Sequence, residues 1–156
     1  MEKLNEHLLS AWLRLSTSVV NSRLVSELPY NESLICNVLY NQICSGNDSG
    51  LTATELCNET KMAKSLMNRS LNQLEKLGII SRVRSALDKR QVLISLNLDK
   101  AGVYLKQHQD ILKLLDTIIE NIGETASEQA ITLFQNISDI ADRQFDKFNY
   151  IKEERI

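Results

Sequence analysis

The sequence contains few residues that turn or break a chain. Its 156 residues include one proline and five glycines, the two residue types that most often mark turns and loops. Few turns imply long, uninterrupted elements. The remaining composition, 43% hydrophobic and 24% charged, is that of an ordinary globular protein. Together these features predict a mainly helical chain.

Long apolar runs are also missing. No run approaches the roughly 18 to 20 residues that a membrane-crossing helix needs. The N-terminal segment is interrupted by charges every few residues and lacks the small-residue cleavage site of a signal peptide. We therefore expect a cytoplasmic protein with no membrane partner. In that reducing compartment Cys36, Cys44 and Cys57 are expected to be buried free thiols, and the sequence leaves any redox role for them open.

Residues for catalysis and metal binding are scarce. The two histidines, His7 and His108, lie about a hundred residues apart. The sequence has no glycine-rich phosphate loop and no nucleophile elbow. It also has no cluster of histidine and cysteine at the spacing of zinc ligands. These absences argue against an enzyme and predict neither a cofactor nor a metal site.

Charge is distributed unevenly along the chain. Between Lys61 and Arg90 eight basic residues stand against two acidic ones, a net charge of +6. Because the whole chain carries −2, the remainder carries −8. A basic segment in an acidic protein is typical of a surface that binds the phosphate backbone of a nucleic acid. A solvated charged face is the alternative, and charge alone leaves both interpretations open.

Both ends of the chain carry helical periodicity. Apolar residues recur at spacings of three and four near each end: Leu4, Leu8, Trp12, Leu15 and Val19, and Phe134, Ile137, Ala141, Phe145 and Phe148. We expect the first helix to end near Pro29 and a second helix to follow over about residues 33–43. A long helix should run over about 100–122, with Asp99 as its N-cap and Gly123 as its stop. The pattern Thr125-x-x-Glu128 predicts a capping box that opens the last helix.

The middle of the chain has a different pattern. Thr52-Ala-Thr-Glu55 is a capping box that opens a short helix ending near Glu59. The next helix runs over 64–78 with Met67, Leu71 and Leu74 on its buried face. After that helix the apolar period changes to two over residues 79–84 and 92–98, and the polar join over 85–90 predicts a hairpin.

A short helix, a tight turn, a second helix and a hairpin make up a winged helix-turn-helix. The second helix of this unit suits the major groove of DNA. The predicted fold class is mainly α with a two-stranded β-hairpin wing, forming a single domain over 1–156. Residues 31–99 would form the winged helix-turn-helix lobe. The helices of 1–30 and 100–156 are longer than that lobe can cover, so we expect them to pack against a second copy of the chain as dimerisation helices.

At this point a family resemblance can be stated. The segment LCNETKMAKSLMNRSLNQLEKLGIISRVRSALDKRQVLISLNLDKAG, residues 56–102, resembles the MarR family of winged helix-turn-helix transcriptional regulators. The most specific pieces are LEKLGIISR, the DKR of the wing, and LISLNLDKAG leading back into a helix. The close match covers about a third of the chain, and the flanking helices agree with the family in number, length and order.

The resemblance implies a homodimer that reads a pseudo-palindromic operator. The family's recognition helix would face DNA with Lys64, Ser65, Asn68 and Arg69. The wing would place Arg90 in a minor groove, with Asp88 orienting its guanidinium group. Three further basic residues of the segment would supply phosphate contacts or solubility: Arg82, Arg84 and Lys89.

Three positions depart from the family pattern. Lys61 occupies a turn position where many members have glycine, and Ala63 stands where a capping Asp or Ser is common. Losing such a cap typically costs around 1 kcal/mol, so the start of the recognition helix is expected to shift or fray. Leu66 replaces a small polar residue, which leaves a thymine methyl group as its one suitable base contact.

The leading hypothesis is a sequence-specific, double-stranded-DNA-binding regulator without enzymatic activity. Repression is the more common mode of the family. A small apolar or aromatic effector, bound between the dimer helices and the lobes, would release the DNA. The candidates for its pocket are Trp12, Tyr40 and Tyr104, although aromatic residues on helices more often belong to the core. The alternative is a winged-helix protein-interaction module without DNA binding. The +6 segment argues against it, because a protein-binding module does not require an arginine-rich wing.

Overall fold

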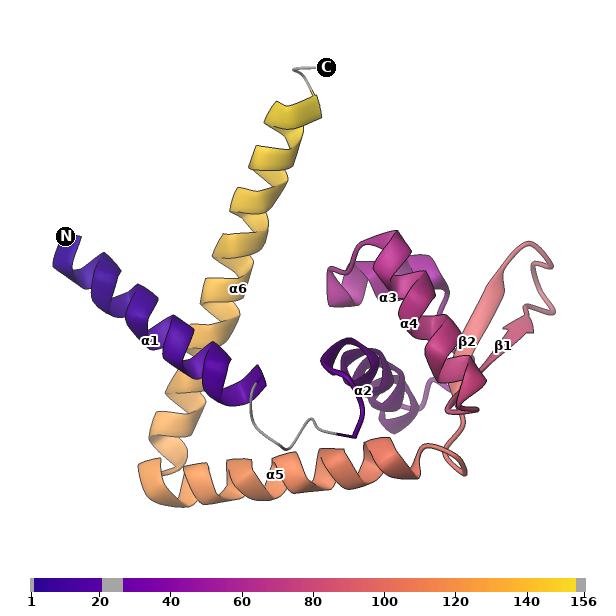
Figure 1. Cartoon of the computed structure of the whole chain (residues 1–156), viewed down its shortest axis with the longest axis horizontal. Helices are drawn as coiled ribbons and strands as arrows, with labels where there is room; N and C mark the ends of the chain where they lie inside the picture. Colours follow the sequence, from indigo (N-terminus) through magenta and orange to yellow (C-terminus); the bar gives the residue numbers. More distant parts are fainter. Residues whose placement is uncertain (1, 21–26, 154–156) are drawn as a thin grey trace. The chain divides into compact units, whose positions relative to one another are not determined.

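The structure, a computed structural model, describes residues 2–20 and 27–153, and the side chains of residues 3–18 and 27–144. In chain order the elements are α1 (Glu2–Val20), α2 (Tyr30–Cys44), α3 (Ala53–Thr60), α4 (Lys64–Lys76), β1 (Ile80–Arg84), β2 (Val92–Leu96), α5 (Gly102–Ile122) and α6 (Glu124–Glu153) (Figure 1). The predicted fold class, mainly α with a two-stranded hairpin, is confirmed. Contacts divide the chain into two units, residues 1–111 and 112–156, and each is described by itself.

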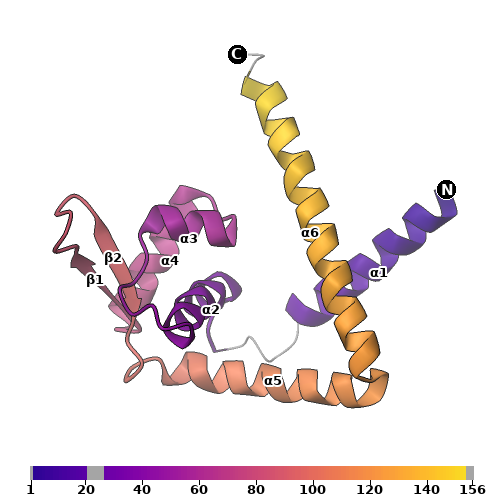
Figure 2. The same cartoon turned by 180° about the vertical axis from the view of Figure 1, so that it is seen from behind.

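The core of the first unit lies among α2, α3 and α4 (Figure 2). The hairpin and the start of α5 complete it. Met67, Leu71 and Leu74 on α4 are fully buried, as their spacing predicted. Burial of such a side chain contributes roughly 1.5–3 kcal/mol, so this stripe fixes which face of α4 turns inward. The other large buried apolar side chains are Leu28, Ile35, Leu39, Leu51, Leu56, Ile79, Ile80, Ile94, Leu96 and Tyr104.

Pro29 begins a helix rather than ending one. It is the N-cap residue of α2, and its carbonyl accepts a hydrogen bond from the backbone amide of Ser33 at 2.9 Å. α1 is described as far as Val20, and the expected end of the first helix near Pro29 falls outside the described residues. A proline suits a helix start because the amide that it lacks would have no partner there.

Two predicted caps near the C-terminal helices were wrong. The backbone amide of Lys100 donates to the carbonyl of Asn97 at 3.0 Å, which places Asp99 in a turn before α5 instead of at its N-cap. Gly123, with φ of +85°, ends α5 as predicted. α6 begins directly after it, so Thr125 lies inside the helix and does not cap it. Figure 2 shows the sharp turn between α5 and α6.

The capping box at the start of α3 is confirmed. The Thr52 hydroxyl accepts from the Glu55 amide at 3.3 Å, and the Glu55 carboxylate accepts from the Thr52 amide at 2.7 Å and from its hydroxyl at 2.8 Å. The hydrogen bonds from the Thr52 backbone amide and hydroxyl hold the pKa of Glu55 below its usual value. The backbone amides of Thr52 and Glu55 at this helix start therefore each have a hydrogen-bond acceptor within the capping box.

The three cysteines are free thiols in different surroundings. Cys36 is fully buried, and burial, with a smaller effect of the Glu32 carboxylate, raises its pKa to about 12. Cys57 is half-buried. Cys44 is exposed, which corrects the expectation of a buried thiol. It is the last residue of α2, beyond the part of the helix that reaches the core.

Large apolar side chains remain exposed on three helices. On α1 they include Leu8 and Trp12, which are 58% and 53% exposed. In the second unit they occupy α5 and α6: Leu112, Leu114, Leu115, Ile118, Ile119, Ile122, Ile131, Leu133, Phe134 and Ile140. The predicted apolar positions Val19, Phe145 and Phe148 lie outside the described side chains. Within the described part of the chain, none of the helices is long and apolar enough to span a membrane.

Candidate nucleic-acid interface

The turn between α3 and α4 depends on one strained residue. Lys61 ends α3 in the left-handed conformation, with φ of 56° and ψ of 19°, at a position where many members of the family that the sequence resembles have glycine. It is the one non-glycine residue with positive φ in the part of the chain that the structure describes. That conformation costs about 1 kcal/mol for a residue with a side chain. The tight turn between the two helices therefore forms without glycine.

α4 begins at Lys64, where the spacing predicted, although its cap is missing. Ala63 is the N-cap residue and supplies no side-chain hydrogen bond. Its carbonyl accepts from the backbone amide of Met67 at 2.9 Å, which is the first bond of the helix. The expected shift of the helix start does not occur. The first amides of α4 have no capping side chain, and such amides attract anions such as phosphate.

The polar residues of the first two turns of α4 lie on its exposed side. Lys64, Ser65, Asn68 and Arg69 are all exposed, whereas Met67 is fully buried. Spacings of one, four and five residues place these four side chains on neighbouring positions of one helix face. Leu66 is half-buried beside them. The predicted recognition residues therefore form one surface.

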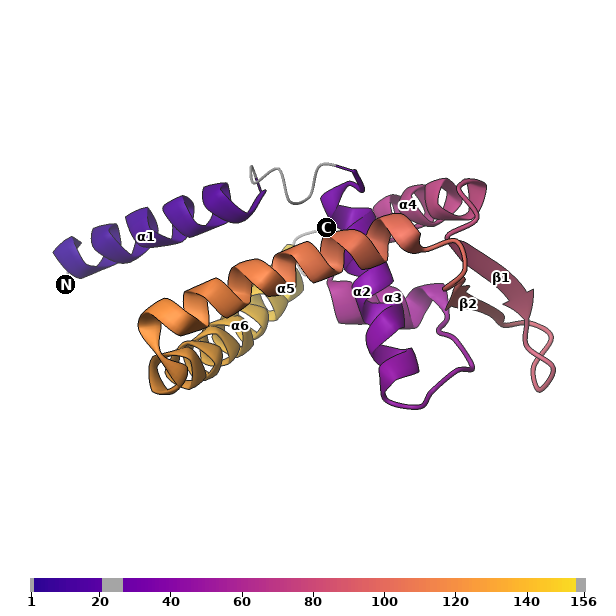
Figure 3. The same cartoon turned by 90° about the horizontal axis from the view of Figure 1, so that it is seen from below.

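The hairpin is anchored to the lobe at its base. β1 and β2 pair antiparallel from Ile80 opposite Leu96 to Arg84 opposite Val92, and the first of these pairs is buried. Leu51 forms a bridge to Ile94 through two backbone hydrogen bonds of 2.9 and 2.7 Å. From this base the hairpin tip projects away from the helices of the first unit (Figure 3).

Short polar contacts order the tip of the hairpin. The Ser85 hydroxyl accepts from the amides of Leu87 and Asp88 at 3.2 and 3.3 Å, and the Ser85 amide donates to the carbonyl of Gln91 at 3.0 Å. The Asp88 carboxylate accepts from the backbone amide of Arg90 at 3.0 Å. The hydrogen bond described for Asp88 therefore holds the backbone of Arg90. The family resemblance had implied that Asp88 would orient the guanidinium group of Arg90 instead.

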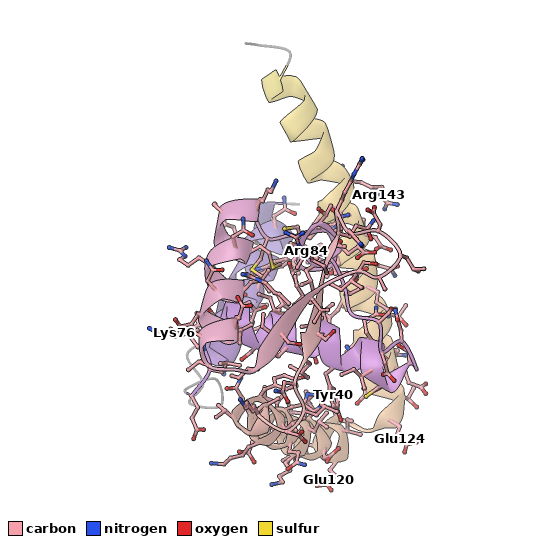
Figure 4. All side chains as sticks on the ribbon, turned by 90° about the vertical axis from the view of Figure 1, so that its right-hand side faces the viewer. Tyr40, Lys76, Arg84, Glu120, Glu124 and Arg143 are labelled. Atoms are coloured by element: carbon pink, nitrogen blue, oxygen red, sulfur yellow. The ribbon has the colours of Figure 1, made fainter. Side chains whose placement is uncertain are left out.

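Arg82 differs from the other basic residues. Its Nη1 lies 2.9 Å from Asn72 Oδ1 and 2.9 Å from Glu75 Oε2, both on α4. The other eight predicted site residues are exposed. Figure 4 shows α4 beside the hairpin, with Lys76 and Arg84 labelled. The sequence contained a signal for this difference: Arg82 has the strand parity of buried Ile80 and so belongs to the inward face of β1.

Known proteins are similar to this region in sequence and to the whole chain in fold. Residues 42–91, from the end of α2 to the wing, match the model of the MarR family. The regulator BilQ of Clostridium symbiosum, named as an HTH-type transcriptional regulator, is 26% identical over 106 residues, which are 68% of this chain and 74% of BilQ.

Two solved regulators have the same fold at low identity. FabT of Streptococcus pneumoniae, solved in complex with DNA, is 20% identical with a TM-score of 0.64, over 89% of this chain and 98% of FabT. PcaV of Streptomyces coelicolor, solved with its natural ligand, is 20% identical with a TM-score of 0.65, over 88% and 91% of the two chains. In residues 42–91 the chain is therefore similar to the MarR family of transcriptional regulators, and as a whole it has the fold of FabT and PcaV.

Proposed function

We propose that this protein is a sequence-specific regulator that binds double-stranded DNA with α4 in the major groove and the hairpin tip in the adjacent minor groove. One observation carries the proposal: apart from the paired Arg82, the basic residues of the +6 segment 61–90 are exposed on α4, on the turn before it and on a projecting hairpin. A merely solvated charged face needs neither arrangement. FabT, with the same fold, has been solved with DNA bound.

The residues divide by the chemistry of their side chains. Asn68 and Arg69 suit the edges of adenine and guanine, while Lys64 and Ser65 suit phosphates, together with the uncapped amides of α4. Arg90 would enter the minor groove, its backbone held by Asp88. Arg84 and Lys89 are exposed and would bind flanking phosphates.

The apolar side chains exposed on α1, α5 and α6 support a homodimer. A monomer rarely exposes so many large apolar residues on neighbouring helical positions. In the proposal, residues 1–30 and 100–156 are dimerisation helices that flank the lobe of residues 31–99 within one domain. A two-fold dimer places two recognition helices on a pseudo-palindromic operator, where bound protein would repress transcription.

A small apolar or aromatic effector is the remaining part of the proposal. PcaV, with the same fold, was solved with a natural ligand. In this chain Tyr40, Tyr104 and His108 form an aromatic cluster between α2 and the start of α5, with ring centroids 5.3 to 5.9 Å apart. Screening small aromatic acids and phenols by thermal shift, with and without operator DNA, tests this part: a true effector raises the melting temperature and weakens DNA binding.

Selection from a random-sequence duplex library tests DNA recognition directly. We expect enrichment of a pseudo-palindromic motif, and an affinity for it that falls steeply with added salt because binding releases counterions from the phosphates. Failure to enrich any motif would contradict sequence-specific binding. A flat salt response would instead favour the protein-interaction module.

The wing is tested by Arg90→Ala. Loss of a groove contact should weaken binding to the selected duplex by about 1–3 kcal/mol without changing the dimer. Lys76→Ala is the matched control, since Lys76 is exposed in the last turn of α4, outside both the proposed dimerisation helices and the proposed contact residues. Equal affinities of the Arg90 variant and the control in a gel-shift titration would rule out the wing contact.

A further inference from the structure

One basic residue of the interface is held by the protein itself. The Arg82 side chain is 25% exposed and its Glu75 partner is 44% exposed, so the pair is only partly open to solvent. A single guanidinium nitrogen lies 2.9 Å from both the Glu75 carboxylate and the Asn72 amide oxygen. A phosphate contact by Arg82 would have to compete with this carboxylate, which also repels phosphate.

The partners of Arg82 join two elements that reach DNA separately. Asn72 and Glu75 are three residues apart on α4, hence on one face of the helix. Arg82 is the central residue of β1, opposite Ile94. Only residues 77–79 connect the helix to the strand. The hydrogen bonds of Arg82 therefore form a second connection, across the angle between the recognition helix and the wing.

We propose that Arg82 is a positioning residue that fixes the wing relative to the recognition helix, with Asn72 and Glu75 as its anchors. The inference rests on the proposed DNA-binding function. The end of β1 lies about 7 Å along the strand from Arg82 at the usual rise per residue, and the loop at the tip of the wing extends beyond it. Rotating the strand by about 10° about Arg82 moves that end by roughly 1 Å and the tip by more, which exceeds the spread of about 0.5 Å in hydrogen-bond lengths.

Glu75→Ala separates positioning from phosphate contact. If Arg82 binds phosphate, removing the carboxylate frees the guanidinium group and DNA binding should tighten. If Arg82 positions the wing, Glu75→Ala should weaken binding to the selected duplex as Arg82→Ala does, each by about fivefold, the upper end for an exposed ion pair. The double variant should then be no weaker than Arg82→Ala alone. Glu75→Gln keeps an acceptor oxygen and should retain most of the affinity.

Glu59→Ala is the control for charge, because Glu59 is an exposed carboxylate on α3 of the same lobe. The slope of log affinity against log salt gives a second readout. Losing a phosphate contact would reduce its magnitude by about 0.9, whereas a positioning residue leaves it unchanged. A purely structural role would lower the melting temperature without changing the affinity of the folded protein at 25 °C.

Hydrogen exchange without DNA tests the connection independently of the function. Arg82→Ala and Glu75→Ala should both speed amide exchange in β1 and β2, and Glu59→Ala should not. Faster exchange in a protein that binds no DNA would support the connection and refute the DNA-binding proposal. Unchanged exchange in both variants, or tighter DNA binding by Glu75→Ala, would overturn the positioning role of Arg82.

Discussion

Replacing Gly50 with alanine should loosen the base of the wing. Gly50 has φ of +79°, and a Cβ atom there would lie 2.6 Å from the carbonyl oxygen of Ile94 and 2.6 Å from Ser95 Oγ. The serine hydroxyl can rotate away. The carbonyl cannot, because it accepts the hydrogen bond from Leu51 that holds the loop to β2. The clash therefore falls on the bridge between Leu51 and Ile94.

The magnitude follows from two contributions. The left-handed conformation of an alanine costs about 1 kcal/mol. Displacing the bridge removes two backbone hydrogen bonds, each with a net contribution of about 1 kcal/mol. Gly50→Ala should thus lower the free energy of unfolding by about 3 kcal/mol, a large part of the 5–15 kcal/mol typical of a domain.

Gly46→Ala is the matched control. Gly46 has nearly the same φ, +83°, in the same loop, but nothing lies within 4 Å of its added Cβ. It should therefore lose only the backbone contribution of about 1 kcal/mol. The assay is urea denaturation of both variants at one protein concentration, since stability of a dimer depends on concentration. Equal losses in the two variants would refute the steric argument.

Three further predictions concern the helices and the thiols. Ala63→Ser should add the missing cap of α4 and raise the free energy of unfolding by about 1 kcal/mol; a neutral result in the same denaturation assay would mean that the helix start is satisfied otherwise. Thr52→Ala should cost about 1 kcal/mol at pH 7. The pKa of Glu55 is lowered in the folded protein, so the stabilisation by its carboxylate is present above the usual pKa and is lost as the pH falls through the folded pKa. The difference in the free energy of unfolding between Thr52→Ala and the unmodified protein, measured by denaturation against pH, should therefore narrow in acid. Iodoacetamide at pH 8 should alkylate exposed Cys44 in the native protein but Cys36, with its pKa raised to about 12 by burial, only after unfolding; mass spectrometry showing early modification of Cys36 would contradict its burial.

The local elements could be predicted because their determinants lie within a few residues of one another. The spacing of Met67, Leu71 and Leu74 placed α4 with its buried face inward, and Thr52 with Glu55 placed the start of α3. The change of period after Gly78 placed the hairpin. Helical bonds, caps and strand alternation all connect positions close in sequence, so a pattern in the chain is sufficient to identify them.

Errors arose where one pattern fitted two places. Asp99 and Thr125 are good capping residues, but the turn at Lys100 and the left-handed Gly123 moved the helix starts away from them. A capping residue acts only if the chain changes direction there, which depends on the packing of the helices on either side.

The sequence by itself determined the order of the elements, the basic character of α4 and the hairpin, and the resemblance of this region to the MarR family. Tertiary structure alone decided what individual polar side chains contact. Arg82, one of several basic residues in the sequence, is bound to Asn72 and Glu75 because packing sets β1 against α4. Asp88 supports the backbone of Arg90 because the tip folds around Ser85. A hydrogen bond requires its atoms within about 3 Å, and only the packed chain sets such distances between elements.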